Sequence, residues 1–139
     1  MFDDPNSGPL ADAGKLLLRL ALGILILFHG VNKIQHGIAP IEAMVSGYGL
    51  PGVLGNAVYL GEVVGPLMLI AGYYARIGAA LIVINMVVAL LLVHTGDVLM
   101  LIEHGGWRLE LQAMYLFSAL ALALTGPGRF AFDARRSSL

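Results

Sequence analysis

The sequence predicts an all-α protein, an integral membrane four-helix antiparallel bundle. Of its 139 residues, 58% are hydrophobic and only 12% are charged, which is far from the balance of a soluble domain. The hydrophobic residues gather in four runs, near residues 16–28, 60–73, 77–93 and 109–124. Each run extends through its neighbours to about 20 residues, the length that a helix needs to cross a bilayer. Only Gly78 and Asn85 interrupt the third run, so it lacks the polar face of a soluble helix.

We expect these helices at about residues 12–36, 55–74, 76–95 and 107–126 of one domain that covers residues 1–139. Two longer connections, at about residues 37–54 and 96–106, then lie together on the outer side. The first contains several prolines and glycines and cannot be one regular element. Its residues 40–46 are predicted to form a short helix among the lipid headgroups. The short turn near residues 72–75 makes the second and third helices antiparallel.

The basic residues predict how the chain is oriented in the membrane, which it crosses several times. On one side lie Lys15, Arg19, Arg76, Arg129, Arg135 and Arg136, whereas only Lys33 and Arg108 lie on the other. Because lysine and arginine are enriched in cytoplasmic segments, both termini are predicted to be cytoplasmic. The first residues are acidic where a secretory signal is basic, so we expect no cleavable signal.

A carboxylate inside the second apolar run is the feature around which the polar residues are organised. Glu62 lies about 9 Å along a helix from Asn56, which places it in the outer half of the membrane. An ionisable group within a spanning helix costs about 3 kcal/mol, so it indicates either a functional site or an architectural ion pair. Gly61 and Gly65 would let a neighbouring helix approach closely. Pro66 cannot donate to the Glu62 carbonyl, which predicts a kink.

Polar residues on other helices are candidates to join Glu62. On the first helix a stripe with steps of three and four is predicted to face the bundle; it consists of Arg19, Leu22, Ile26, His29, Lys33 and His36. No residue is predicted to be catalytic, and the candidates for ligand binding are Glu62, His29, Lys33, Glu110 and Tyr115. Lys33 could instead extend to the membrane surface. Glu110 could simply stabilise the start of a helix.

The third helix carries two further polar residues. Asn85 is predicted mainly to hold helices together, as are Gly61, Gly65 and Pro66. His94 follows nine residues later, half a turn out of phase, so we expect the two to face different neighbours. His29 and His94 are weak candidates for binding haem b or a metal, although hydrogen bonding is the commoner role of such histidines. With no cysteine, the chain has no thiol of its own for an iron–sulfur cluster or for covalent haem.

The polar residues are distributed unevenly across the predicted membrane. All four histidines lie on or near the outer side, together with Lys33, Glu62 and most of the other polar residues of the helices. A continuous ion path across the membrane is therefore not expected. The pattern favours a pocket that opens toward the outer leaflet.

Three stretches resemble the DoxX family of small bacterial membrane proteins. They are RLALGILILFHGVNK, GEVVGPLMLIAGYYARIGAAL and GGWRLELQAMYLFSALALALTGPGRFAFD, and the last contains the Gly-Pro-Gly-Arg with a following aspartate that is common in the family. The resemblance implies a four-helix bundle that crosses the bacterial inner membrane several times and a link with respiratory and redox assemblies. Relatives include a subunit of a thiosulfate:quinone oxidoreductase and a membrane partner of superoxide dismutase and a sulfurtransferase.

Residues and resemblance together predict a membrane subunit of a redox complex, with no electron carrier of its own and with a site for a quinone- or lipid-like molecule. Its predicted partners are the bilayer and other subunits of that complex. Binding to nucleic acid is not predicted. An accessory subunit is favoured over an enzyme acting alone. The alternative is a catalytically silent anchor in which Glu62 pairs with Lys33 or Arg108 to hold helices in register. A transporter is less favoured because no inverted repeat is evident.

Overall fold

The computed structural model describes residues 8–132, and its regular elements there are all helical, which confirms the all-α prediction. The α-helices are α1 (Pro9–His36), α2 (Ala39–Gly47), α3 (Gly65–Ala71), α4 (Ala75–Val93) and α5 (Glu110–Thr125). Two 3₁₀ turns, η1 (Gly52–Ala57) and η3 (Thr95–Asp97), and one π-helical turn, η2 (Leu60–Val64), lie between them. In residues 8–132 the one β-type pairing is an isolated bridge between Leu101 and Trp107.

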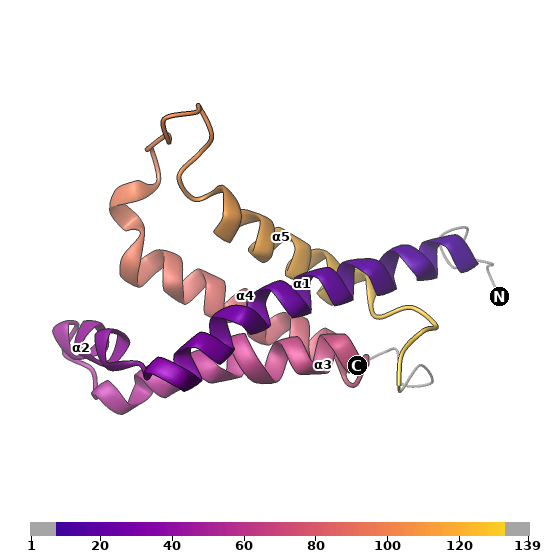
Figure 1. Ribbon diagram of the computed structural model, residues 1–139, viewed down its shortest axis with the longest axis horizontal. Coiled ribbons are helices and arrows are strands. Elements are labelled where there is room, and N and C mark those ends of the chain that lie inside the picture. The colour runs from indigo at the N-terminus through magenta and orange to yellow at the C-terminus, as the bar shows by residue number, and fades with distance from the viewer. Residues whose placement is uncertain (1–7, 133–139) are drawn as a thin grey trace.

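The long helices pack side by side. Helix α1 packs against η2, α3 and α5, and α4 packs against α3 and α5. Figure 1 shows the start of α1, the end of α3 and the end of α5 at one end of the molecule, with α2 at the opposite end, which we call the α2 end. There the last turns of α4 and its connection to α5 stand away from α1 and α2 (Figure 1).

The buried apolar core lies where α1, α3, α4 and α5 meet. Its largest fully buried aliphatic side chains are Ile26, Leu69, Ile82 and Leu122. These residues come from all four helices, so burying them favours this mutual arrangement.

A buried arginine binds backbone carbonyl groups at the end of the molecule opposite the α2 end. Arg19 on α1 is 1% exposed. Its guanidinium donates to the carbonyl oxygens of Leu69 (2.8 Å), Pro127 (2.9 Å) and Phe130 (2.9 Å). Arginine carries five donors in a fixed planar arrangement, which suits it to bind several carbonyls at once. Arg19 therefore joins α1 to the end of α3 and to the segment that follows α5.

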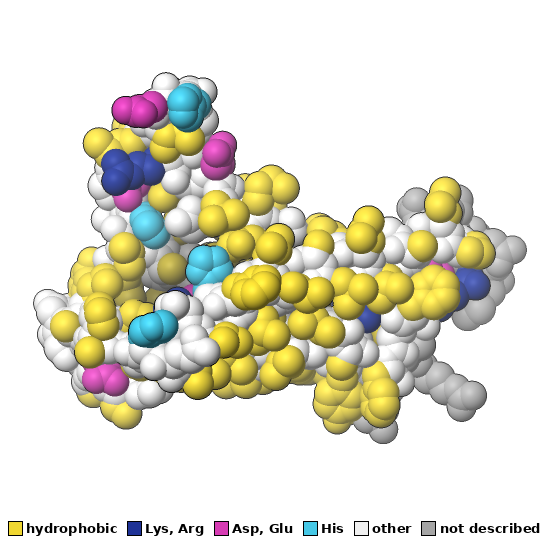
Figure 2. All heavy atoms as spheres, in the orientation of Figure 1, with side chains coloured by type: hydrophobic (Ala, Val, Ile, Leu, Met, Phe, Trp, Pro, Cys, Tyr) yellow, Lys and Arg dark blue, Asp and Glu magenta, His cyan; other side chains and the backbone are white. Residues whose placement is uncertain are grey.

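Two segments are long and apolar enough to cross a membrane, Gly52–Ala71 and Ala75–Val93. The apolar helix α5 is shorter, with 16 residues. Figure 2 shows hydrophobic side chains covering much of the flank of the molecule, while charged and histidine side chains gather toward its ends. The spanning of α1 and α5 and the side on which the termini lie remain predictions. Arg135 and Arg136, which support that orientation, lie outside the described residues.

Several boundaries differ from the prediction: α1 begins at Pro9 and not near residue 12, and α4 ends at Val93 and not near residue 95. The expected second helix is three elements, because η1, η2 and α3 follow one another, and it ends at Ala71, where Gly72 adopts a left-handed conformation (φ 71°). Helix α5 begins at Glu110 and not near Trp107. The indole nitrogen of Trp107 donates to the Val98 carbonyl at 2.7 Å, so this tryptophan belongs to the loop before the helix.

Candidate functional site

Glu62 lies in the π-helical turn η2, four residues before Pro66. The Gly65 N–H donates to the carbonyl of Leu60, five residues earlier, in place of the usual four. Pro66 has no N–H to continue the normal ladder. Where a kink was expected at Pro66, the structure has a widened turn on the N-terminal side of this proline, and π turns of this kind are frequent at functional sites.

Close approach of two backbones brings Lys33 to Glu62. A Cβ atom on Gly30 would overlap the Glu62 carbonyl oxygen, so only glycine allows α1 to lie this near to η2. Lys33 follows one turn later on α1, and its Nζ donates to Glu62 Oε2 at 2.5 Å. Glu62 is only 7% exposed, so its charge is balanced by this ammonium group where little water reaches it.

While one face of η2 contacts α1, its other face lies against α4. A Cβ on Gly61 would overlap the side chain of Asn85, and a Cβ on Gly65 would lie against Ile82 and the carbonyl of Gly78. Both glycines therefore serve the close helix contact for which their spacing is suited. Asn85 packs on Gly61, yet its buried amide nitrogen Nδ2 has no hydrogen-bond partner among residues 8–132.

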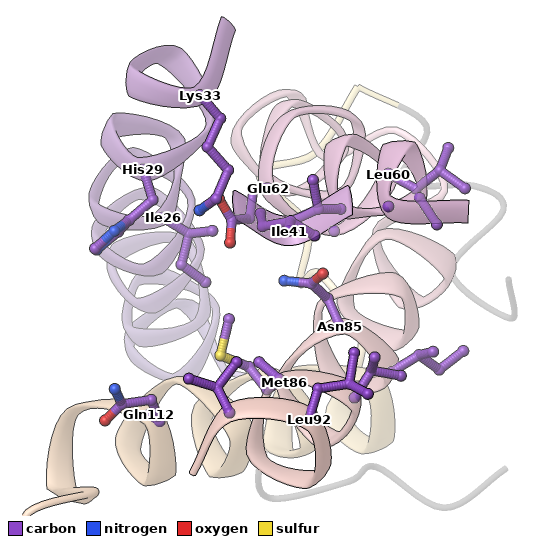
Figure 3. Close-up of a pocket in the computed structure, with 18 of the residues that line it drawn as sticks. Ile26, His29, Lys33, Ile41, Leu60, Glu62, Asn85, Met86, Leu92 and Gln112 are labelled. Atoms are coloured by element: carbon purple, nitrogen blue, oxygen red, sulfur yellow. The ribbon is translucent and has the colours of Figure 1, made fainter. Parts of the chain in front are cut away.

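A cavity of about 450 Å³ lies at the α2 end, between the pair Lys33–Glu62, the C-terminal part of α4 and the N-terminal part of α5. Figure 2 shows the molecule hollowed in this corner. Aliphatic side chains from α1, α2, η2 and α4 form most of the wall, including Ile26, Ile41, Leu60, Met86 and Leu92 (Figure 3). Its volume is in the range of small-molecule sites, which combine an apolar wall with a few polar groups.

The cavity brings together most of the candidate ligand-binding residues. His29, Lys33, Glu62 and Tyr115 all line it. The rings of His29 and Tyr115 meet edge to face, with centroids 6.1 Å apart, and so connect α1 with α5. Glu110 is not part of the lining; it is exposed, and its carboxylate lies close to Gly106.

Asn85 and His94 contact different neighbours, Gly61 and Asp97, as expected, yet both also line this cavity, which the half-turn phase difference between them did not predict. That phase difference holds only for a straight helix through residue 95. Helix α4 ends at Val93, and the backbone of His94 is not helical (φ −113°, ψ 12°). Its Nδ1 lies 3.1 Å from Asp97 Oδ2. Residues 8–132 contain no group of three or more histidine, aspartate or glutamate side chains placed to hold a metal ion.

Gln112 is a polar lining residue that was not among the candidates. Its Oε1 is buried and has no hydrogen-bond partner in the described part of the chain. The sequence does contain a signal for it, since Gln112 lies three residues before Tyr115 and shares a helix face with it.

Comparison with known proteins agrees with the resemblance seen in the sequence. The profile of the DoxX family matches residues 14–95, more than half of the chain. The chain belongs to the DoxX family. This DoxX protein is also similar to "Putative oxidoreductase CatD" of Bacillus subtilis (strain 168), with 27% identity over 122 residues that cover 88% of this chain and 86% of the relative. No solved structure matches it. The family is membrane-associated, and together with the two apolar segments this identifies a membrane protein.

Proposed function

We propose that this DoxX protein is a subunit of a redox complex and that its cavity binds a quinone- or lipid-like molecule. The observation that carries the proposal is the meeting of Lys33, Glu62 and Asn85 on the wall of an otherwise mainly aliphatic cavity. An apolar chamber accepts a hydrocarbon tail, while a few fixed polar groups orient a head group.

The chain would act as an accessory subunit, since it has no cysteine with which to hold an iron–sulfur cluster. Electrons would then come from a partner protein. The name of the Bacillus subtilis relative, which calls it an oxidoreductase, favours a redox setting.

The proposed topology places four helical segments across a bacterial inner membrane with both termini in the cytoplasm. The two apolar segments would be joined by α1 and α5, whose exposed apolar side chains would then face lipid. The α2 end would lie at the outer leaflet, so the cavity would be reached from that side.

The alternative is a silent anchor subunit, and the same ion pair favours it. Lys33 and Glu62 connect α1 to η2, as an architectural pair would, whereas Arg108 lies 3.4 Å from Asp97 instead. A pair that only holds helices would need no ligand.

Isolation of the tagged protein from native membranes in mild detergent tests the redox proposal. We expect mass spectrometry to find redox proteins in stoichiometric amounts. A Glu62→Gln variant should still assemble with them but should impair the activity of the complex. Full activity of an assembled Glu62→Gln complex would support the anchor, and a protein that emerges alone would remove the support for both.

A further inference from the structure

The cavity has a polar wall whose charges are already balanced. Lys33 and Glu62, which both line the cavity, form an ion pair, and Arg108, which does not line it, lies 3.4 Å from an Asp97 carboxylate oxygen. His94 also faces Asp97. An anionic head group would find no uncommitted cation among these residues and would meet the Glu62 carboxylate. A neutral head group carries no such cost.

One donor on this wall lacks an acceptor. Asn85 Nδ2 is buried without a partner in the described range 8–132, and leaving such a donor unpaired is costly. Figure 3 shows the amide of Asn85 pointing into the open space between Glu62 and Met86. The Cβ, Cγ and Oδ1 atoms of Asn85 lie beside Gly61, so the side chain packs against η2 at this point of the cavity.

We infer that the cavity recognises a neutral amphiphile whose head group presents a carbonyl oxygen to Asn85 Nδ2. This inference rests on the proposed function and specifies the chemistry of its ligand. The head group lies beside Lys33 and Glu62, while the tail lies along the aliphatic side chains of α4 and η2, such as Leu92 and Leu60. Asn85 is thus a specificity residue as well as a packing residue.

Binding to the purified full chain in detergent tests the inference with four probes that share one tail length. Decylubiquinone and decanoylglycerol carry carbonyl oxygens, decylbenzene carries no polar head, and decyl phosphate carries an anion. We expect one of the two carbonyl probes to bind at least about tenfold more tightly than decylbenzene, the order expected for a hydrogen bond to a buried donor. Decyl phosphate should bind more weakly still. Which carbonyl probe binds better distinguishes a quinone from a glyceride source.

The matched variants are Asn85→Leu, Asn85→Gln and Glu110→Gln. Leucine has nearly the shape of asparagine, so it should reduce the affinity of the carbonyl probe to that of decylbenzene. Its thermal stability should equal or exceed that of the wild type, because an unpaired buried donor is gone. Asn85→Gln keeps an amide and should retain part of the affinity. Glu110, exposed outside the cavity, serves as the control and should have no effect.

Each contrary result has a separate meaning. If a carbonyl probe binds equally well to wild type and Asn85→Leu, or if decylbenzene or decyl phosphate binds as tightly, this inference is overturned while an amphiphile site remains. If none of the probes binds, both this inference and the proposed cavity function fail. A loss of stability in Asn85→Leu would also contradict the inference, because it would show that the amide serves to hold the helices.

Discussion

Lys33 and Glu62, 29 residues apart in the chain, join α1 to the π-helical turn through a 2.5 Å contact between Nζ and Oε2. Glu62 reaches this contact because Gly30 lets α1 lie against its carbonyl oxygen, and Asn85 then faces the same cavity from α4. One glycine on α1 and two on the second segment, Gly61 and Gly65, therefore determine how closely the polar groups are assembled.

Removal of one partner of the ion pair should be more harmful than removal of both. We expect Lys33→Met to lower the free energy of unfolding by about 3 kcal/mol, because it leaves the buried Glu62 carboxylate unpaired. The double variant Lys33→Met/Glu62→Leu should recover most of this loss. Thermal unfolding in detergent measures both. Equal stability of the wild type and Lys33→Met would show that the pair is too well solvated to matter.

The close approach at Gly30 should be sensitive to a single methyl group. We expect Gly30→Ala to destabilise the protein by about 2 kcal/mol, since its Cβ would overlap the Glu62 carbonyl oxygen. Gly14→Ala on the same helix is the matched control, because a Cβ there meets nothing within 4 Å. Alanine at position 14 should be neutral or slightly stabilising. Unfolding midpoints that fall by the same amount in both variants would contradict this contact.

Arg19 should hold the segment after α5 in place. Arg19→Lys keeps the charge but loses the planar set of donors, so we expect a loss of about 2 kcal/mol in stability. The carbonyls of Pro127 and Phe130 would lose their donor, and the segment near them should become more sensitive to protease. Lys15→Met is the control, as it removes a basic residue one turn earlier on α1. Unchanged cleavage in Arg19→Lys would contradict this role.

Local sequence patterns predict much of this fold. The apolar runs predict the helical segments, since their length and composition leave few alternatives. The short helix expected at residues 40–46 is found as α2. The spacing of Gly61 and Gly65 predicts a close neighbour, and the structure identifies that neighbour as α4.

The remaining features depend on contacts between distant parts of the chain. Pro66 predicts a kink, but neither the π turn at Glu62 nor its close contacts with Gly30 and α4 can be read from the sequence. The sequence leaves both Lys33 and Arg108 as partners for Glu62, and their positions in space decide between them. The end of α4 at Val93, which turns His94 toward the cavity, likewise depends on the loop that follows.

A cavity-filling variant tests most directly whether a molecule occupies this site. Ala89 lines the cavity on α4, and Ala89→Phe would fill part of it; Ala121→Phe, at an exposed position of α5 outside the cavity, is the control. Small molecules extracted from the purified wild type and from both variants can be quantified by mass spectrometry. We predict a quinone- or lipid-like molecule in stoichiometric amounts with the wild type and Ala121→Phe, and its loss from a folded Ala89→Phe. Equal retention of the molecule by all three proteins, or no bound molecule in any of them, would contradict a binding role for the cavity.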